Sequence, residues 1–173
     1  MKILHLLLLA LLVGCTTIAA AKDKSTKDSL QQQQFKNMLS LVESNRFQIQ
    51  IDRVYPMKGF DVTKFNPEGT ICLNDSIAKG KLPFFGRAYS LSYSPGEGGI
   101  KFDNFVTERR IKAIEKKKNS LIRYQFNVSG ENDIYRFSMD IFPNGTCTIS
   151  VNSNNRENIS YSGKIEKLPT QCD

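Results

Sequence analysis

The chain has no tryptophan and a single histidine, His5, among its 173 residues. His5 lies in an N-terminal segment that we expect to be removed, so the mature protein would have no imidazole. Serine and cysteine nucleophilic catalysis would then lack its usual base. Zinc would lose its commonest ligand, and the four cysteines contain no CxxC spacing to replace it. We therefore predict no catalytic residue, no metal site and no cofactor. These absences favour a protein that is not an enzyme.

The N-terminal apolar run, from Ile3 to Val13, is too short to span a bilayer. It follows a short basic start and ends in the sequence LVGC, which closes at Cys15. Bacterial lipoproteins are cleaved and acylated at this pattern, so we predict a signal peptide over residues 1–14 and lipid attachment to Cys15. The alternative is ordinary secretory cleavage near Ala21, which would leave a soluble periplasmic or secreted protein.

The chain is basic, with 24 lysines and arginines against 17 acidic residues and a formal net charge of +7. Its densest basic stretch is Arg109–Lys118, RRIKAIEKKK. Such a stretch can contact nucleic acid, or it can be a solvated hairpin whose tip lies at Lys116 to Asn119. We favour the hairpin, because an exported protein rarely meets nucleic acid, and we predict no nucleic-acid partner.

Composition divides the mature chain into a tether, a domain and a tail. Residues 15–25 are small and polar, which predicts a flexible tether. From Thr26 to about Ser44 the apolar residues recur near helical spacing, with Ser25 or Thr26 as a cap, which predicts one amphipathic helix. Residues 26–168 are predicted to form a single β-rich domain that begins with this helix, and residues 169–173 a C-terminal tail.

Beyond Asn45 the apolar residues recur with a period of two, as in strands that bury one face. The clearest runs are 46–52, 122–128, 135–141, 147–151 and 159–165, and the Asn-Gly pair at 144–145 suits a tight hairpin. Weaker candidates lie near 70–73, 88–93, 100–105 and 107–115. The pattern predicts a mainly β fold, an antiparallel meander of about eight strands that forms a small barrel or a two-layer sandwich.

The stretch Leu82–Ser90, LPFFGRAYS, places two adjacent phenylalanines between a proline and a glycine, which are turn residues. In one interpretation a phenylalanine folds under the turn and closes one end of the core. In the other, the aromatic rings stay exposed and contact a partner, as aromatic residues and arginine commonly do at interfaces. We favour the first and retain the second as a hypothesis. The candidate binding residues are Phe84, Phe85, Arg87 and Tyr89.

Three cysteines remain if Cys15 carries a lipid, and paired cysteines are common in oxidising compartments. Cys147 shares a strand face with other apolar residues and should point into the core. Cys72 lies between two apolar residues and should face outward, while Cys172 lies in the tail. We predict a disulfide between Cys72 and Cys172, with Cys147–Cys172 as the alternative.

Five motifs occur in order between about Phe47 and Ile165. They are RVYPM at 53–57, LPFFGRAYS at 82–90, GGIKF at 98–102, FPNGT at 142–146 and SNNRENISYSG at 153–163. Together they resemble the domain-of-unknown-function family 4251, whose members are small, exported and often lipid-anchored proteins of Gram-negative gut anaerobes. The resemblance implies a location on the periplasmic side of the cell envelope or at the outer membrane. It implies no activity, because the family has none assigned.

These observations predict an exported, lipid-anchored envelope protein that contacts the membrane through its acyl chain. Its most favoured role is a non-catalytic binding module for an envelope protein or a small ligand. One alternative is a small-ligand carrier of barrel type, whose mouth would hold the ligand. Another is a hydrolase that uses carboxylates alone and holds two of them a fixed distance apart.

Overall fold

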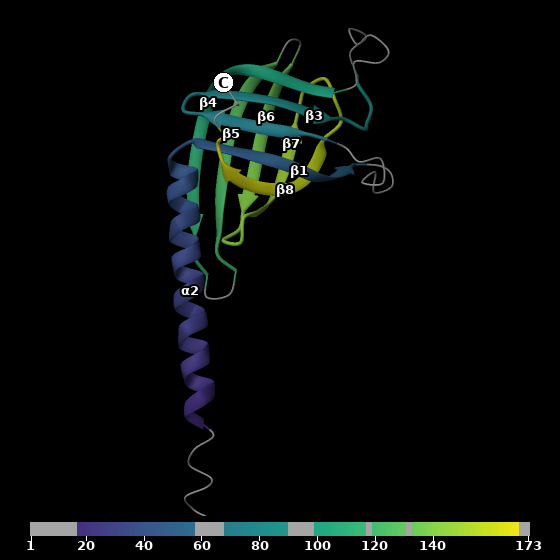
Figure 1. Ribbon diagram of the computed structural model, residues 1–173. Coiled ribbons are helices and arrows are strands. Elements are labelled where there is room, and N and C mark those ends of the chain that lie inside the picture. Colours follow the sequence, from purple (N-terminus) through teal and green to yellow (C-terminus); the bar gives the residue numbers. More distant parts are fainter. Residues whose placement is uncertain (1–16, 58–67, 90–98, 117–118, 131–132, 170–173) are drawn as a thin grey trace, which may run out of the picture. The chain divides into compact units, whose positions relative to one another are not determined.

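The computed structural model describes residues 17–57, 68–89, 99–116, 119–130 and 133–169, with side chains from Asp28 onward (Figure 1). The predicted lipid site Cys15 and the tail residue Cys172 lie outside these ranges. Two compact units are present, Met1–Gln34 and Phe35–Asp173. The elements are α2 (Thr17–Glu43), β1 (Arg46–Pro56), β2 (Thr70–Asn74), β3 (Ile77–Pro83), β4 (Gly99–Ile114), β5 (Leu121–Gly130), β6 (Ile134–Ile141), β7 (Thr146–Asn152) and β8 (Ile159–Lys167).

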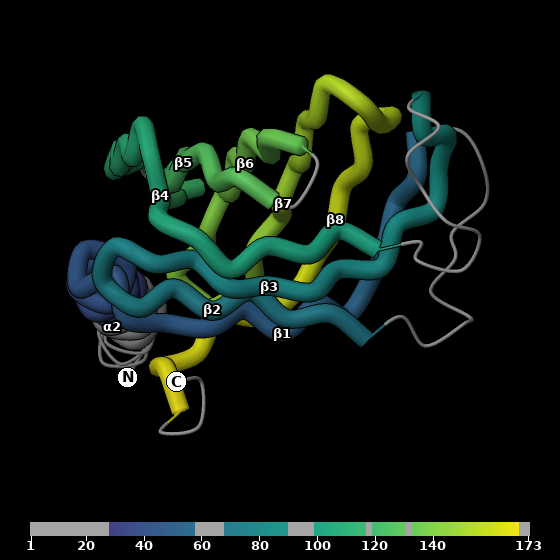
Figure 2. The backbone as a smooth tube through the Cα atoms, turned by 90° about the horizontal axis from the view of Figure 1, so that it is seen from above, coloured from purple at the N-terminus to yellow at the C-terminus, as the bar shows by residue number. Residues whose placement is uncertain are grey.

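The eight strands form a closed antiparallel barrel in which each strand pairs with its neighbours in sequence (Figure 2). The ring closes where β8 pairs with β1, from Phe47 opposite Lys167 to Pro56 opposite Ile159. A register shift between Ile51 and Arg53 interrupts this pairing, and such bulges bend a strand so that a sheet can close. The mainly β prediction is confirmed, and the choice between barrel and sandwich is settled as a barrel.

The barrel interior is filled by aromatic side chains in mutual contact. The ring centroids of Phe47 and Tyr124 lie 5.7 Å apart, those of Tyr124 and Phe126 lie 5.7 Å apart, and Phe126 stacks on Phe137 at 4.8 Å. Phe102 continues the series 5.1 Å from Phe137. Contacts of this kind stabilise beyond the area they bury.

Strand β3 was not predicted, and β4 was predicted as two strands. In β3 the inward position at Gly80 has no side chain, so the apolar alternation is weak. A Cβ at Gly80 would overlap the ring of Phe102, its register partner on β4, so the glycine makes room for that ring. The pairing of β4 with β5 shifts between Phe102 and Val106 and again between Thr107 and Arg110. These shifts break the alternation and made one strand look like two.

Helix α2 begins at Thr17, earlier than the predicted start at Thr26. Residues 17–25, predicted as part of a flexible tether, are therefore helical. Alanine and lysine favour helix, and the run Ala19–Ala21 followed by Lys22 supplies such residues. No described helix is both long and apolar enough to cross a membrane.

The C-terminal part of α2 belongs to the same compact unit as the barrel and contributes to its core. Phe35 and Val42 are buried, and the residues between them include half-buried apolar side chains that pack on the same cluster. The other end of the barrel carries the segment that follows β3. The two ends are therefore built differently, one by a helix and one by connecting segments.

Candidate functional site

The predicted candidate residues lie on the segment Phe84–Tyr89, directly after β3. This segment is joined to the connection between β7 and β8 by backbone hydrogen bonds. The N–H of Glu157 donates to the carbonyl of Arg87 at 2.9 Å, and the N–H of Tyr89 donates to the carbonyl of Asn155 at 2.8 Å. Between these bonds, Ala88 and Arg156 form an antiparallel bridge. The segment therefore has a fixed position at this end of the barrel.

Phe84 points inward and acts as a plug. Its ring is half-buried against the core, and the guanidinium carbon of Arg156 lies 5.0 Å from the ring centroid. Arg156 is itself buried and donates through Nη1 to the carbonyl of Gly99 at 2.9 Å. A buried guanidinium is costly unless it is paired, and the carbonyl and the ring face both compensate it. The interpretation that one phenylalanine closes the core holds for Phe84.

Phe85, Arg87 and Tyr89 point outward from the same segment, and we call these three residues the aromatic rim. Phe85 is 36% exposed, Tyr89 is 65% exposed, and the Arg87 side chain is 75% exposed. The Nε of Arg87 lies 4.0 Å from Oε1 of Glu157, whose side chain is only 9% exposed, so the outer part of the guanidinium stays in solvent while its inner side faces a carboxylate. The rim therefore presents two rings and a cation to solvent.

Four of the five sequence motifs meet around the rim. The motif at 53–57 pairs with the motif at 153–163, because Val54 lies opposite Tyr161 in the β1–β8 register. The hydroxyl of Tyr161 donates to the carbonyl of Pro83 at 2.8 Å, and Arg156 reaches Gly99 of the third motif. Burial raises the pKa of the Tyr161 hydroxyl, so this hydroxyl remains a donor. Only the motif at 142–146 lies elsewhere, at the β6–β7 turn.

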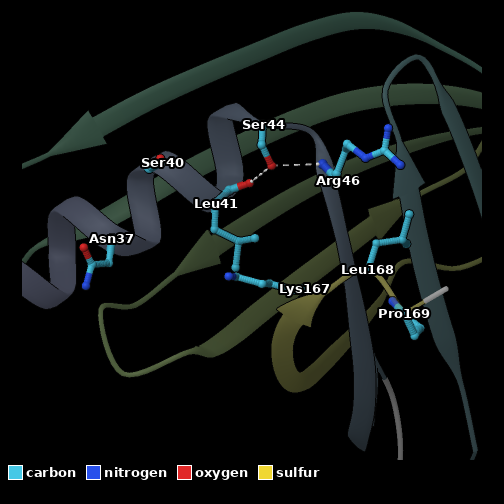
Figure 3. A pocket seen from close by; sticks show the side chains of 8 residues that line it. All are labelled: Asn37, Ser40, Leu41, Ser44, Arg46, Lys167, Leu168 and Pro169. Carbon is cyan, nitrogen blue, oxygen red and sulfur yellow. Dashed lines mark hydrogen bonds between the residues drawn. The ribbon is translucent and has the colours of Figure 1, made fainter.

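A groove of about 780 Å³ lies at the other end of the barrel, between the last turns of α2 and the residues that follow β8 (Figure 3). Its two cationic residues do not converge, because the Arg46 guanidinium is directed away from the Lys167 amine. Arg46 instead approaches Asp75 at 3.5 Å. The lining residues are Asn37, Ser40, Leu41, Ser44, Arg46, Lys167, Leu168 and Pro169. We assign this groove no ligand.

The end of α2 is tied to the barrel by residues that sequence reasoning missed. Asn45 and Asp75 both have positive φ, 52° and 53°, and the N–H of Asp75 donates to the carbonyl of Asn45 at 2.9 Å. The hydroxyl of Tyr124 donates to Oδ1 of Asn45 at 2.9 Å. Burial raises the pKa of Tyr124 to about 12, so the hydroxyl keeps its proton. We call Asn45, Asp75 and Tyr124 the helix latch.

Glu108 and Arg109 extend the latch onto β4. Glu108 has φ of 51° at the second register shift of β4, and Arg109 next to it donates through Nη2 to the carbonyl of Asp75. The Nε of Arg109 and Oδ1 of Asn74 are buried without a hydrogen-bond partner in the described part of the chain. A donor and an acceptor left over at the same junction can be satisfied by water. The latch therefore positions the helix, and we assign it no ligand.

Several carboxylates on the outer face are paired with basic side chains. Asp140 accepts from Nε and Nη2 of Arg123 at 2.7 and 2.8 Å. Asp103 lies 3.5 Å from Lys79. These pairs set the carboxylates against cations, whereas a carboxylate-only hydrolase needs two acids facing each other. The described residues also contain no group of three or more His, Cys, Asp and Glu side chains that could hold a metal ion.

The two cysteines within the described strands are both buried. Cys147 points into the core as predicted, and burial raises the pKa of its thiol to about 12. Cys72 lies between the inward residues Ile71 and Leu73, at an outward position, yet it is only 8% exposed. Its predicted partner Cys172 lies outside the described residues, so the disulfide stays a prediction.

Comparison with known proteins identifies a family. The chain matches the family described as Domain of unknown function (DUF4251) over residues 29–165. Its fold is similar to that of a DUF4251 family protein from Bacteroides eggerthii, with a TM-score of 0.53 and 18% sequence identity over 82% of this chain and 91% of that chain. No curated protein matches it. Since the family match covers most of the sequence, the chain belongs to the DUF4251 family of proteins of unknown function.

Proposed function

We propose that this chain is a non-catalytic binding module of the cell envelope, which captures a protein partner through the aromatic rim. One observation carries the proposal. Phe85, Arg87 and Tyr89 are exposed on a segment that is joined to the barrel by backbone hydrogen bonds and whose Phe84 packs on the core. Exposed aromatic residues and arginine on a fixed support are the residues that most often dominate protein interfaces.

The surroundings of the rim favour a macromolecular partner over a small ligand. Two more apolar side chains, Tyr55 and Met57, are exposed where β1 ends, at the same end of the barrel. Together with the rim they offer a surface of apolar groups beside a cation. A small ligand would need a concave cavity, and the aromatic series from Phe47 to Phe102 fills the barrel interior instead.

We further propose that the module is held on the periplasmic side of the envelope by a lipid on Cys15. The support is the sequence LVGC at the end of the apolar run. The mature chain would lose Lys2 and keep a net charge of +6, which suits a partner with an acidic surface. No catalytic step enters this function.

Site-specific crosslinking in the native envelope tests the proposal. A photoreactive phenylalanine analogue is placed at Tyr89, and separately at Phe105, an aromatic residue on β4 that is 64% exposed. We expect a discrete crosslinked protein from position 89 and none from position 105. Phe85→Ala in the same chain should reduce that crosslink about tenfold or more, as for interface hot spots. Equal crosslinking from both positions would contradict the proposal.

A further inference from the structure

The segment that carries the rim has one unpaired backbone edge. The hydrogen bonds from Glu157 to Arg87 and from Tyr89 to Asn155 flank the Ala88–Arg156 bridge. In this antiparallel arrangement, the residue between the two bonds directs its own N–H and C=O to the opposite side. Ala88 is exposed, and no hydrogen bond joins its backbone groups to any residue that the structure describes.

Within the described residues, some barrel strands pair with two neighbours over only part of their length, and β4 beyond Val106 pairs with β5 alone. The Ala88 edge is distinguished by its position between Arg87 and Tyr89 of the rim. The Ala88 edge lies outside the barrel ladder and is held rigidly by its pairing with Arg156. The N–H of Arg87 adds a further tie by donating to Oε2 of Glu157 at 3.2 Å. Because this edge is already ordered, less conformational entropy is lost when a partner binds to it.

We infer that the Ala88 edge binds an extended polypeptide segment of the partner as an added strand. This inference rests on the proposed function and specifies which part of the partner the rim segment binds. An exposed N–H and C=O on one residue are satisfied together by the backbone of an extended peptide, and side chains beside the edge then give specificity.

The side chains of the rim define the sequence of the added strand. Arg87 and Tyr89 flank Ala88 in the paired stretch and are both exposed, whereas Phe85 lies before a bend at Gly86. An added strand therefore places alternate side chains against Arg87 and Tyr89. Arg87 selects Asp or Glu, because a guanidinium binds a carboxylate through charge-assisted hydrogen bonds. The ring of Tyr89 selects an apolar side chain, so the predicted pattern is an acidic and an apolar residue separated by one position.

Ala88→Pro removes the donor that the inference requires. The bonds that fix the segment use the carbonyl of Arg87 and the N–H of Tyr89, so both survive the substitution. Proline is tolerated on strand edges, and it favours an extended conformation in the residue before it. Ala88→Ser is the matched control, because it retains the N–H. We expect both variants to unfold at nearly the same temperature as the wild type.

The experiment uses a phage-displayed library of random dodecapeptides, selected on the purified mature domain. We expect the wild type and Ala88→Ser to enrich peptides with the predicted pattern. A selected peptide, synthesised with blocked ends, should bind Ala88→Pro about tenfold more weakly, the loss expected for one hydrogen bond. Methylating the peptide nitrogen that faces Ala88 should weaken binding to the wild type similarly, which keeps the test valid if Ala88→Pro fails to fold.

Three results would overturn the inference. The first is that no peptide is enriched on the wild type, and the second is that the peptide binds Ala88→Pro and the wild type equally. The third is dimerisation of the wild type that Ala88→Pro abolishes, because a second copy would then occupy the edge. If Phe85→Ala reduces the envelope crosslink while Ala88→Pro does not, the rim binds without an added strand and the proposed function stands. If neither change matters, both fail.

Discussion

Phe84 and Phe85 are neighbours in the chain but have different surroundings. Phe84 lies over Arg156 and packs on the core, whereas Phe85 is exposed. From the sequence, Phe85 was a candidate for the buried plug. The structure gives that position to Phe84, whose ring packs on the core and over the buried Arg156.

Phe84→Ala should therefore destabilise the protein, while Phe85→Ala should not. We expect a loss of about 2–4 kcal/mol for Phe84→Ala, somewhat below the range for fully buried phenylalanine because the ring is half-buried. For Phe85→Ala we expect less than about 1 kcal/mol, as at ordinary surface positions. Urea unfolding of the two variants measures both values. Equal unfolding midpoints for the two variants would show that Phe84 is not a plug.

At the scale of elements, the end of α2 depends on the helix latch. The Tyr124 hydroxyl donates to Asn45, and burial raises the pKa of Tyr124 to about 12 in the folded protein. An unfolded tyrosine titrates near pH 10. The folded state therefore holds a proton that the unfolded state releases between these values. Stability from this group is fully present below about pH 10 and is lost as the pH rises towards 12.

Comparison of the wild type with Tyr124→Phe isolates this contribution. We expect the free energy of unfolding of the wild type to fall more steeply between about pH 10 and 12 than that of the variant. The variant should also be about 1–3 kcal/mol less stable at pH 7, because the Asn45 amide loses its donor. Denaturant unfolding at a series of pH values measures both effects. Parallel pH profiles would show that Tyr124 does not titrate with unfolding.

At the scale of the whole molecule, the strand register brings the tail within reach of Cys72. Lys167 ends β8 opposite Phe47, and Phe47 lies opposite Leu73, the neighbour of Cys72. Two strand spacings are about 10 Å, and five residues of extended chain span about 17 Å. The chain from Lys167 to Cys172 is therefore long enough to reach Cys72.

We predict that the exported protein contains a Cys72–Cys172 disulfide. It would close a loop of about a hundred residues, worth about 4–5 kcal/mol as an upper value in the chain-entropy model. Cys147 should stay reduced, because its thiol is buried in the core. Peptide mapping without reductant identifies the pair. A disulfide peptide that contains Cys147, or three free thiols, would refute the assignment.

The predicted lipid on Cys15 also concerns the whole molecule, since it decides where the protein is located. We expect the mature N-terminus to be an acylated Cys15, which mass spectrometry detects as a lipid-sized mass increase. Several acyl chains hold a protein firmly, at about 0.8 kcal/mol per buried CH₂. Cys15→Ala should release the protein from the membrane fraction. An unmodified mature chain that starts at Lys22 would contradict the prediction.

The class of the fold and most of its elements follow from the local pattern of apolar residues in the sequence. Alternation along 122–128, 135–141 and 147–151 predicted strands β5, β6 and β7, because one face of each is buried and the other is solvated. Strand β3 was not recognised because its inward residue Gly80 has no side chain and interrupts the apolar alternation. The ring of Phe102, which belongs to β4, occupies the space at this position. The alternation of apolar residues along one strand does not show that a side chain from another strand fills the space beside it.

How the barrel closes and what lies at each end could be read only from the folded protein. The closure depends on β1 meeting β8, and the helix latch depends on Tyr124 meeting Asn45, contacts between residues far apart in sequence. The stretch LPFFGRAYS was recognisable in the sequence, but the difference between a half-buried Phe84 and an exposed Phe85 was not. The position of Phe84 depends on its contact with Arg156, a residue far away in sequence that meets it only in the folded protein. Burial and backbone pairing are properties of the whole molecule, and so they assign the roles that sequence leaves open.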